Sequence, residues 1–130
     1  MDTYTVEFRI EDISLVPSEI TKVLKLSPSQ VREGNNVNHN PLWAYDGIST
    51  EDNFIEQEWK TLEEGLLFVL DRLEPKFDLI QSKFFMYKRY FWCAHFQESF
   101  SGGPVFSTHL LKRLAKFNTE LIIKNYYSEK

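Results

Sequence analysis

Hydrophobic and polar residues alternate cleanly at the start of the chain. From Tyr4 to Ile10 every second residue is apolar, and the residues between them are polar or charged. A period of two is typical of a half-buried β-strand. Residues 120–127, which read ELIIKNYY, are rich in apolar and aromatic side chains and predict a second strand that closes the fold.

The most hydrophobic stretch is residues 84–96, which read FFMYKRYFWCAHF. Its apolar and aromatic residues occupy both odd and even positions, and only Lys88 and Arg89 interrupt them near the middle. A strand that is apolar on both sides is normally covered on both sides. We therefore expect this stretch to be the central strand of a small sheet, with both of its faces packed.

Three segments have helical spacing. A short helix is predicted over residues 18–25, because Pro17 can open it and Pro28 prevents its continuation. A long helix is predicted from the capping pattern at residues 49–52 to Leu73, where Pro75 ends it. Its expected buried side is Ile55, Trp59, Leu62, Leu66, Val69 and Leu73. A third helix opens at Ser107 and buries Leu110, Leu111, Leu114 and Ala115.

Residues 32–42 read REGNNVNHNPL and predict a mobile loop, since asparagine and glycine favour turns. Residues 43–45 should then return to the sheet as a short extended segment. The elements together predict a single α+β domain over residues 1–130, with a mainly antiparallel sheet and helices packed on it. The order of strand and helix near both ends of the chain suggests a relation to the ferredoxin-like plan.

The composition favours a soluble, cytoplasmic protein. The chain has 130 residues, which suffices for one hydrophobic core, and its single cysteine, Cys93, excludes an internal disulfide. No signal-like segment opens the chain, and no apolar run approaches the ~18 residues that a membrane helix needs. Aromatic residues make up 15% of the chain, so the core or a binding surface depends on ring packing.

Charge is unevenly distributed along the chain. Residues 46–80 carry ten acidic and three basic side chains, whereas residues 81–130 carry three acidic and eight basic ones. The net charge of −4 disfavours a nucleic-acid-binding function, although basic and aromatic residues mix around Lys88 and Trp92. On the predicted long helix, Glu56, Glu63 and Glu64 form either a solvated face or a docking surface for a basic protein partner.

Residues that could support catalysis are few. Cys93 and His95 lie two apart on a predicted strand and would face the same side, as a thiolate–imidazole pair requires. Within an aromatic strand, however, a cysteine usually acts as a small buried hydrophobe. His39, His95 and His109 do not have metal-ligand spacing. We therefore expect no catalytic residues, no metal and no cofactor.

Two other functions stay open at this level. A pocket under the 32–42 loop could bind a small ligand or carry out catalysis with Arg32, His39 and Trp43, although Trp43 could equally pack beneath the loop. The second open function is that of a homodimer formed through the aromatic sheet. The Ser101–Pro104 segment lacks the lysine of a phosphate-binding loop and is interpreted as a sharp turn.

Several marks spread over the chain resemble a bacterial family known as domain of unknown function 4279. They are the strand Tyr4–Ile10, the helix start Pro17–Ile20, Arg32-Glu33-Gly34, the isolated Trp43, and the helix Leu110–Leu114 with the strand that ends at Tyr126. The resemblance carries no assigned activity. Some small bacterial proteins of this general kind are similar to immunity proteins, which neutralise a toxin. The combined expectation is a non-catalytic protein-binding domain, with an immunity protein and a basic toxin as one version of it.

Overall fold

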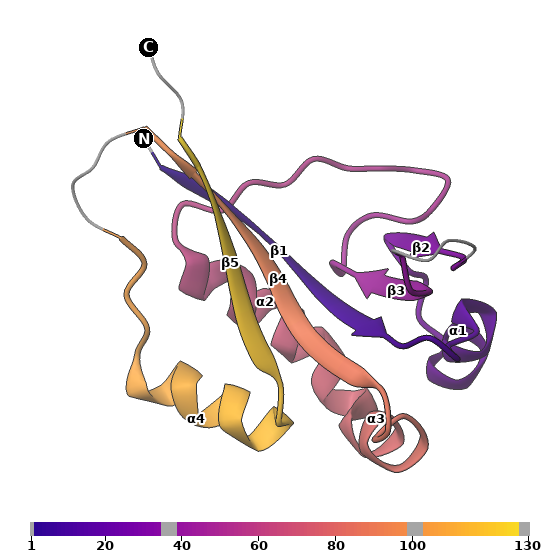
Figure 1. The fold of residues 1–130 in the computed structure, drawn as a ribbon. Coiled ribbons are helices and arrows are strands. Elements are labelled where there is room, and N and C mark those ends of the chain that lie inside the picture. The colour runs from indigo at the N-terminus through magenta and orange to yellow at the C-terminus, as the bar shows by residue number, and fades with distance from the viewer. Residues whose placement is uncertain (1, 35–38, 99–102, 128–130) are drawn as a thin grey trace.

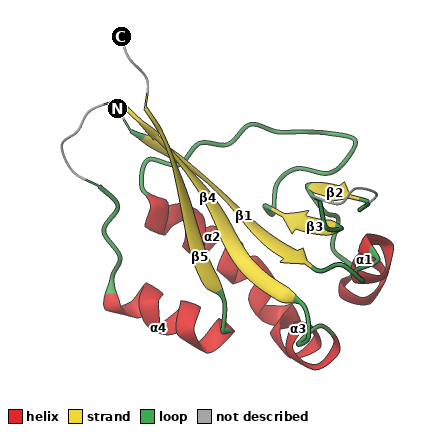
Figure 2. Ribbon diagram, viewed as in Figure 1, coloured by secondary structure: helices red, strands yellow, loops and turns green. Residues whose placement is uncertain are grey.

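The computed structural model describes residues 2–34, 39–98 and 103–127 (Figure 1). Within them, five strands form one sheet in the order β2-β3-β1-β4-β5, and four α-helices pack on it (Figure 2). The strands are β1 (Thr3–Glu11), β2 (Gln30–Arg32), β3 (Leu42–Tyr45), β4 (Lys88–Gln97) and β5 (Glu120–Tyr127). The helices are α1 (Pro17–Leu24), α2 (Leu62–Leu73), α3 (Phe77–Lys83) and α4 (Thr108–Phe117), with the 3₁₀-helix η1 (Glu74–Lys76) between α2 and α3.

The sheet is mainly antiparallel, and the expected α+β fold is confirmed. β1 pairs antiparallel with both β3 and β4, and β2 pairs antiparallel with β3. Only β4 and β5 run parallel among the described strands, and α4 connects them. These two strands are immediate neighbours, whereas the ferredoxin-like plan splits its βαβ units with an intervening strand. The C-terminal unit therefore departs from that plan.

The alternation in β1 decides which face of the sheet is buried. Val6 and Phe8 point toward the helices, where Phe8 packs edge-on against Phe117 of α4 with ring centroids 5.6 Å apart. On β4, Phe91 lies opposite Phe8 and Cys93 lies opposite Val6, so β4 extends the same core. One continuous core thus lies between the sheet and the helices.

The other face of the sheet, called the open face below, has no helix over it among the described residues (Figure 2). It carries the polar residues of β1 and the alternate residues of β4, including Tyr90 and Trp92. The expectation that both faces of the 84–96 stretch are covered by other elements is therefore wrong for this face. Tyr90 is nevertheless buried, because side chains of the neighbouring strands on the same face surround it.

The long helix begins later than the capping pattern predicted. Ser49 does not cap a helix; its hydroxyl accepts the Ile55 N–H at 2.9 Å and donates to the Ile55 carbonyl at 3.1 Å, which stabilises a loop. α2 begins instead after Thr61, whose Oγ1 accepts the Glu64 N–H at 3.1 Å. The connection of residues 46–61, called the β3–α2 connection below, is consequently free to pass along the sheet.

Pro75 does not end the helical region. It occupies the first turn of η1, where its missing N–H is not needed, and α3 follows directly. The segment before the predicted 84–96 strand is therefore helical as far as Lys83. The third predicted helix does begin after Ser107, whose Oγ accepts the Leu110 N–H at 3.1 Å. The predicted 32–42 loop is described only at its ends, because residues 35–38 lie outside the described ranges, as do Ser101 and Gly102.

Gly65 on α2 tests how tightly the helix packs on β1. A Cβ at this position would lie 2.7 Å from Trp59 Cδ1 and 2.7 Å from Val6 Cγ2. Alanine has the higher helix propensity, yet the overpacking should dominate, so Gly65→Ala should lower the free energy of unfolding by about 1–3 kcal/mol. The measurement is the midpoint of urea unfolding.

The matched control is Gly103→Ala, since a Cβ at Gly103 meets nothing within 4 Å. It should leave the free energy of unfolding unchanged to within about 0.5 kcal/mol. A Gly65→Ala protein as stable as the original chain would contradict the packing of α2 described above.

Candidate functional site

The open face carries a groove of about 710 Å³ beside the N-terminal half of β1. One wall is the β3–α2 connection, and the other is the end of β4. The lining residues are Thr3, Thr5, Val6, Glu7 and Arg9 from β1; Asp46, Ile48 and residues 54–59 from the connection; and Trp92, Phe96, Gln97 and Glu98 from the β4 side. This space is called the groove below.

Backbone pairing positions the wall formed by the connection. The Tyr4 N–H donates to the Trp59 carbonyl at 2.8 Å, and the Trp59 N–H donates to the Tyr4 carbonyl at 2.7 Å. Trp59 also packs on Phe68 of α2, with ring centroids 4.9 Å apart. The connection is therefore fastened to β1 and to α2 at the point where it borders the groove.

The groove is acidic. Its lining contains five carboxylates and one guanidinium, that of Arg9. Glu58 accepts a hydrogen bond from the Thr3 hydroxyl, while Glu56 is exposed on the connection. An excess of carboxylates along one hollow raises the local concentration of cations. The electrostatics of the groove thus favour a positively charged ligand.

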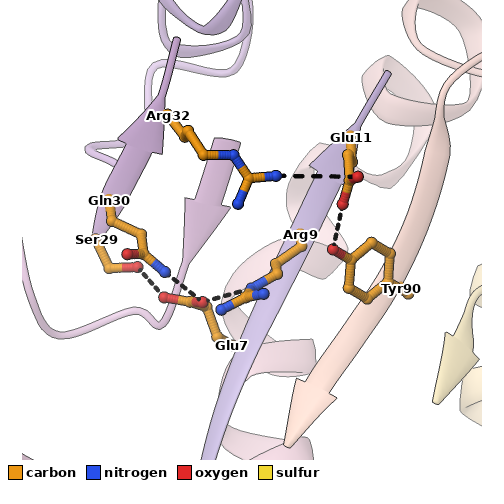
Figure 3. Close-up of polar contacts among 7 residues, drawn as sticks. All are labelled: Glu7, Arg9, Glu11, Ser29, Gln30, Arg32 and Tyr90. Carbon is orange, nitrogen blue, oxygen red and sulfur yellow. Dashed lines mark hydrogen bonds and ion pairs between the residues drawn. The ribbon is translucent and has the colours of Figure 1, made fainter. Parts of the chain in front are cut away.

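Arg9 does not cancel this excess, because Glu7 already pairs with it. The Arg9 Nε donates to Glu7 Oε1 at 2.7 Å (Figure 3). Glu7 also accepts from the Gln30 amide at 3.0 Å and from the Ser29 hydroxyl at 2.9 Å. The Arg9 guanidinium lies over the Trp92 ring, 4.7 Å from its centroid. Arg9 and Trp92 are thus held together, and both line the groove.

A second polar cluster lies farther along β1. The Tyr90 hydroxyl donates to Glu11 Oε1 at 2.6 Å, and Arg32 Nη2 lies 4.0 Å from Glu11 Oε2 (Figure 3). Burial, with a further contribution from the bond to Glu11, raises the pKa of Tyr90 to about 12. Tyr90 is therefore a neutral hydrogen-bond donor near pH 7, and the contacts of Glu11 link β2, β1 and β4 on the open face.

Aromatic and apolar side chains form the rim of the groove. Phe54 on the connection is 77% exposed, and Phe96 at the end of β4 is 39% exposed. Phe96 stacks on Tyr126 of β5 with ring centroids 5.4 Å apart. Exposed rings beside carboxylates suit side chains that combine an apolar stem with a cationic end, such as lysine and arginine.

The three glutamates predicted to bind a partner have separate positions. Glu56 lies on the connection and lines the groove. Glu63 accepts the backbone N–H of Ser107 at 2.6 Å, which ties the start of α2 to the start of α4. Glu64 accepts from the Thr61 hydroxyl at 3.1 Å, and its backbone N–H donates to the same hydroxyl at the start of α2. Because α2 begins only at Leu62, the three do not share one helical face.

The three residues of the predicted ligand pocket do not come together. Arg32 lies on the open face and donates from Nε to the Asn40 carbonyl at 2.9 Å. Trp43 lies on the helix side of the sheet, fully buried, and its Nε1 donates to the Thr21 hydroxyl at 3.0 Å. His39 is exposed. Since Arg32 and Trp43 lie on opposite faces of the sheet, they cannot line one pocket.

Cys93 and His95 share one face, as their spacing predicted, but they do not form a nucleophile–base pair. Burial raises the pKa of the Cys93 thiol to about 12, so the thiol is protonated near pH 7. The ring nitrogens of His95 lie 2.9 Å from Asp2 Oδ2 and 3.0 Å from Asn125 Oδ1. His95 also stacks on Tyr4 at 4.6 Å. These contacts give His95 a structural role at one end of the sheet.

A second hollow, of about 610 Å³, lies between α4 on one side and the end of α2, η1 and the start of α3 on the other. Arg113 of α4 reaches across it and pairs with Asp71 of α2 at 2.9 Å and with Glu74 of η1. The lining mixes three carboxylates with two cationic side chains and one histidine, so the electrostatics do not clearly favour one sign of ligand charge. Within residues 2–34, 39–98 and 103–127, no group of three or more potential metal ligands occurs. The described helices are all too short or too polar to cross a membrane.

The burial of Cys93 predicts an unreactive thiol. In the native protein at pH 8, Cys93 should not react with a chromogenic disulfide reagent on the timescale of free cysteine, because the thiolate is scarce and the sulfur is inaccessible. After unfolding in urea, one thiol should react fully. Rapid labelling of the folded chain would contradict the buried position of Cys93.

The contact between Asp2 and His95 predicts a pH-dependent contribution to stability. The Glu98 N–H and the His95 ring hold the pKa of the Asp2 carboxyl below its usual value. A depressed pKa stabilises the fold above the unfolded pKa of about 4, and the effect is lost as the pH falls through the lower folded value. Asp2→Asn should therefore lower the urea midpoint at pH 7 and have little effect near pH 2. An equal loss of the urea midpoint at both pH values would contradict this role of the Asp2 carboxylate.

Among the comparisons with known proteins, the one with family models supports the resemblance seen in the sequence. Neither the curated proteins nor the solved structures contain a match to this chain. A family model described as domain of unknown function (DUF4279) matches residues 2–128. That match spans nearly every residue, including all five strands. The chain belongs to the DUF4279 family.

Proposed function

We propose that this chain is a cytoplasmic, non-catalytic domain that binds another protein, and that the groove receives a basic segment of that partner. The observation that carries the proposal is the combination of five carboxylates with exposed aromatic rings on a sheet face that no described helix covers. Complementary charge would steer the partner to the groove, and the rings would pack on the stems of its lysine or arginine side chains.

The state of the ionisable groups supports binding rather than catalysis. Acid–base chemistry needs two groups whose environments push their pKa values apart within one site. In the groove Glu7 is neutralised by Arg9, and Glu56 is exposed to solvent. The buried groups with raised pKa values are absent from its lining; they are Tyr4, Tyr45, Tyr90 and Cys93.

An immunity protein that neutralises a basic toxin is one specific form of this proposal. Such a partner would present lysine or arginine side chains to the groove, and the bound complex would cover the toxin's cationic surface. The DUF4279 family itself assigns no function that favours or opposes this form. It is supported only by the charge of the groove and by the analogy of small size and class.

Charge reversal in the groove tests the proposal. The probe is a capped peptide in which threonine and lysine alternate, and binding is measured by NMR titration at low and at physiological salt. Glu56→Lys should weaken binding about threefold to tenfold at low salt, because an attractive charge becomes repulsive. The difference should shrink as salt is added, since the charges are exposed.

Two control variants locate the effect. Glu51→Lys makes the same change of charge at an exposed position outside the groove lining and should leave binding nearly unchanged. Glu64→Lys places the same charge at the start of α2, the other predicted docking position. If Glu64→Lys weakens binding of the peptide while Glu56→Lys does not, the partner docks on α2 and the groove proposal is wrong.

A further inference from the structure

The β1 edge that faces the groove has a gap in its hydrogen-bond ladder. Tyr4 pairs with Trp59 on this edge, and Phe8 pairs with Tyr45. Alternate residues of a strand direct their backbone groups to the same side, so the Val6 N–H and carbonyl point to this edge as well. Among the described residues, neither group of Val6 has a hydrogen-bond partner there.

The gap arises because the chain leaves the sheet after Tyr45 and returns only at Trp59. Asp46 turns the chain away, since its Oδ1 accepts the N–H groups of Ile48 and Ser49 at 2.8 and 2.7 Å. Residues of both arms, including Ile48 and Gln57, line the groove together with Val6. The unpaired backbone groups therefore lie at the floor of the groove, at a residue that is only 5% exposed.

A backbone donor and acceptor side by side, left unpaired on a strand edge, are a template for pairing with another extended segment. One residue of extended backbone offers the complementary pair, with its N–H and carbonyl on one side. A helix cannot offer it, since its backbone groups bond within the helix. The shape of the gap thus favours an extended segment over a helical one.

We infer that one residue of the partner's extended backbone enters this gap and forms the missing pair with Val6. This inference rests on the proposed function and adds to it how the basic segment is held. The positions beside the gap are occupied by Tyr45 and Trp59, so only one residue can pair at Val6. The partner's neighbouring residues must rise from the gap into the groove, where the carboxylates and aromatic rings lie.

The recognition would then have two independent parts. The pair with Val6 is formed by backbone groups and is indifferent to the partner's sequence. Preference for basic residues comes from the carboxylates of the groove, including Glu56. A ligand can therefore lose one part and keep the other, which makes the two proposals separable by experiment.

The first measurement uses the uniformly nitrogen-15-labelled intact chain without ligand. The Val6 amide should exchange its hydrogen faster than the amide of Phe8, which is bonded to Tyr45. Saturation with the alternating threonine–lysine peptide should slow exchange at Val6 at least about fivefold, as expected for one added hydrogen bond. Exchange at Phe8, which serves as the internal control, should stay the same.

The second measurement uses the same peptide with a methyl group on every backbone nitrogen. This analogue keeps the lysine charges but has no backbone N–H to donate to the Val6 carbonyl. It should bind at least about fivefold more weakly than the parent peptide. Its remaining binding should still respond to Glu56→Lys, because the charges are unchanged.

Both measurements must agree for the inference to stand. If Val6 exchanges as slowly as Phe8 without ligand, the gap does not exist and the inference is overturned. If the parent peptide binds and is sensitive to Glu56→Lys, but Val6 is unaffected or the methylated peptide binds equally well, the backbone pair is wrong while the groove proposal survives. Absence of peptide binding overturns both.

Discussion

The position of β1 at the centre of the sheet determines the rest of the structure. Its strict alternation gives the helices one continuous apolar face and leaves a row of charged and hydroxyl side chains on the other. A shift of one residue in its pairing with β4 would exchange the two faces and expose Val6 and Phe8 to water. The register is therefore strongly specified, and the groove exists because the polar row is fixed to one side.

The sequence was sufficient to predict those helices and strands that have a clear local signal. The alternation after Thr3, the helix start at Ser107 and the apolar run that begins at Glu120 all predicted their elements correctly. The start of α2 was not predictable from residues 49–52, because a serine hydroxyl followed by acidic residues can stabilise a loop as well as a helix. Whether the loop or the helix forms depends on Ile55, whose backbone N–H and carbonyl bond to the Ser49 hydroxyl.

The candidate site was harder to predict from the sequence, because it depends on contacts between residues that are distant along the chain. Glu56 was identified as a partner-binding residue, but only the pairing of Trp59 with Tyr4 brings its segment to the sheet. Trp92 and Arg9 were each visible as strand residues, yet their contact requires the register of β1 on β4. The segregation of charge did predict an acidic surface; the sequence placed it on a helix instead of beside a strand.

Gly65 connects the interior of the protein to this surface. The absence of a side chain at Gly65 lets α2 approach Val6 and Trp59 together, so the helix, the central strand and the wall of the groove are packed as one unit. A wall supported in this way loses little conformational freedom when a ligand arrives. If the groove receives the proposed segment, a preorganised wall of this kind selects ligands by how well their shape already fits. The protein would then discriminate between partners of equal charge according to their contour.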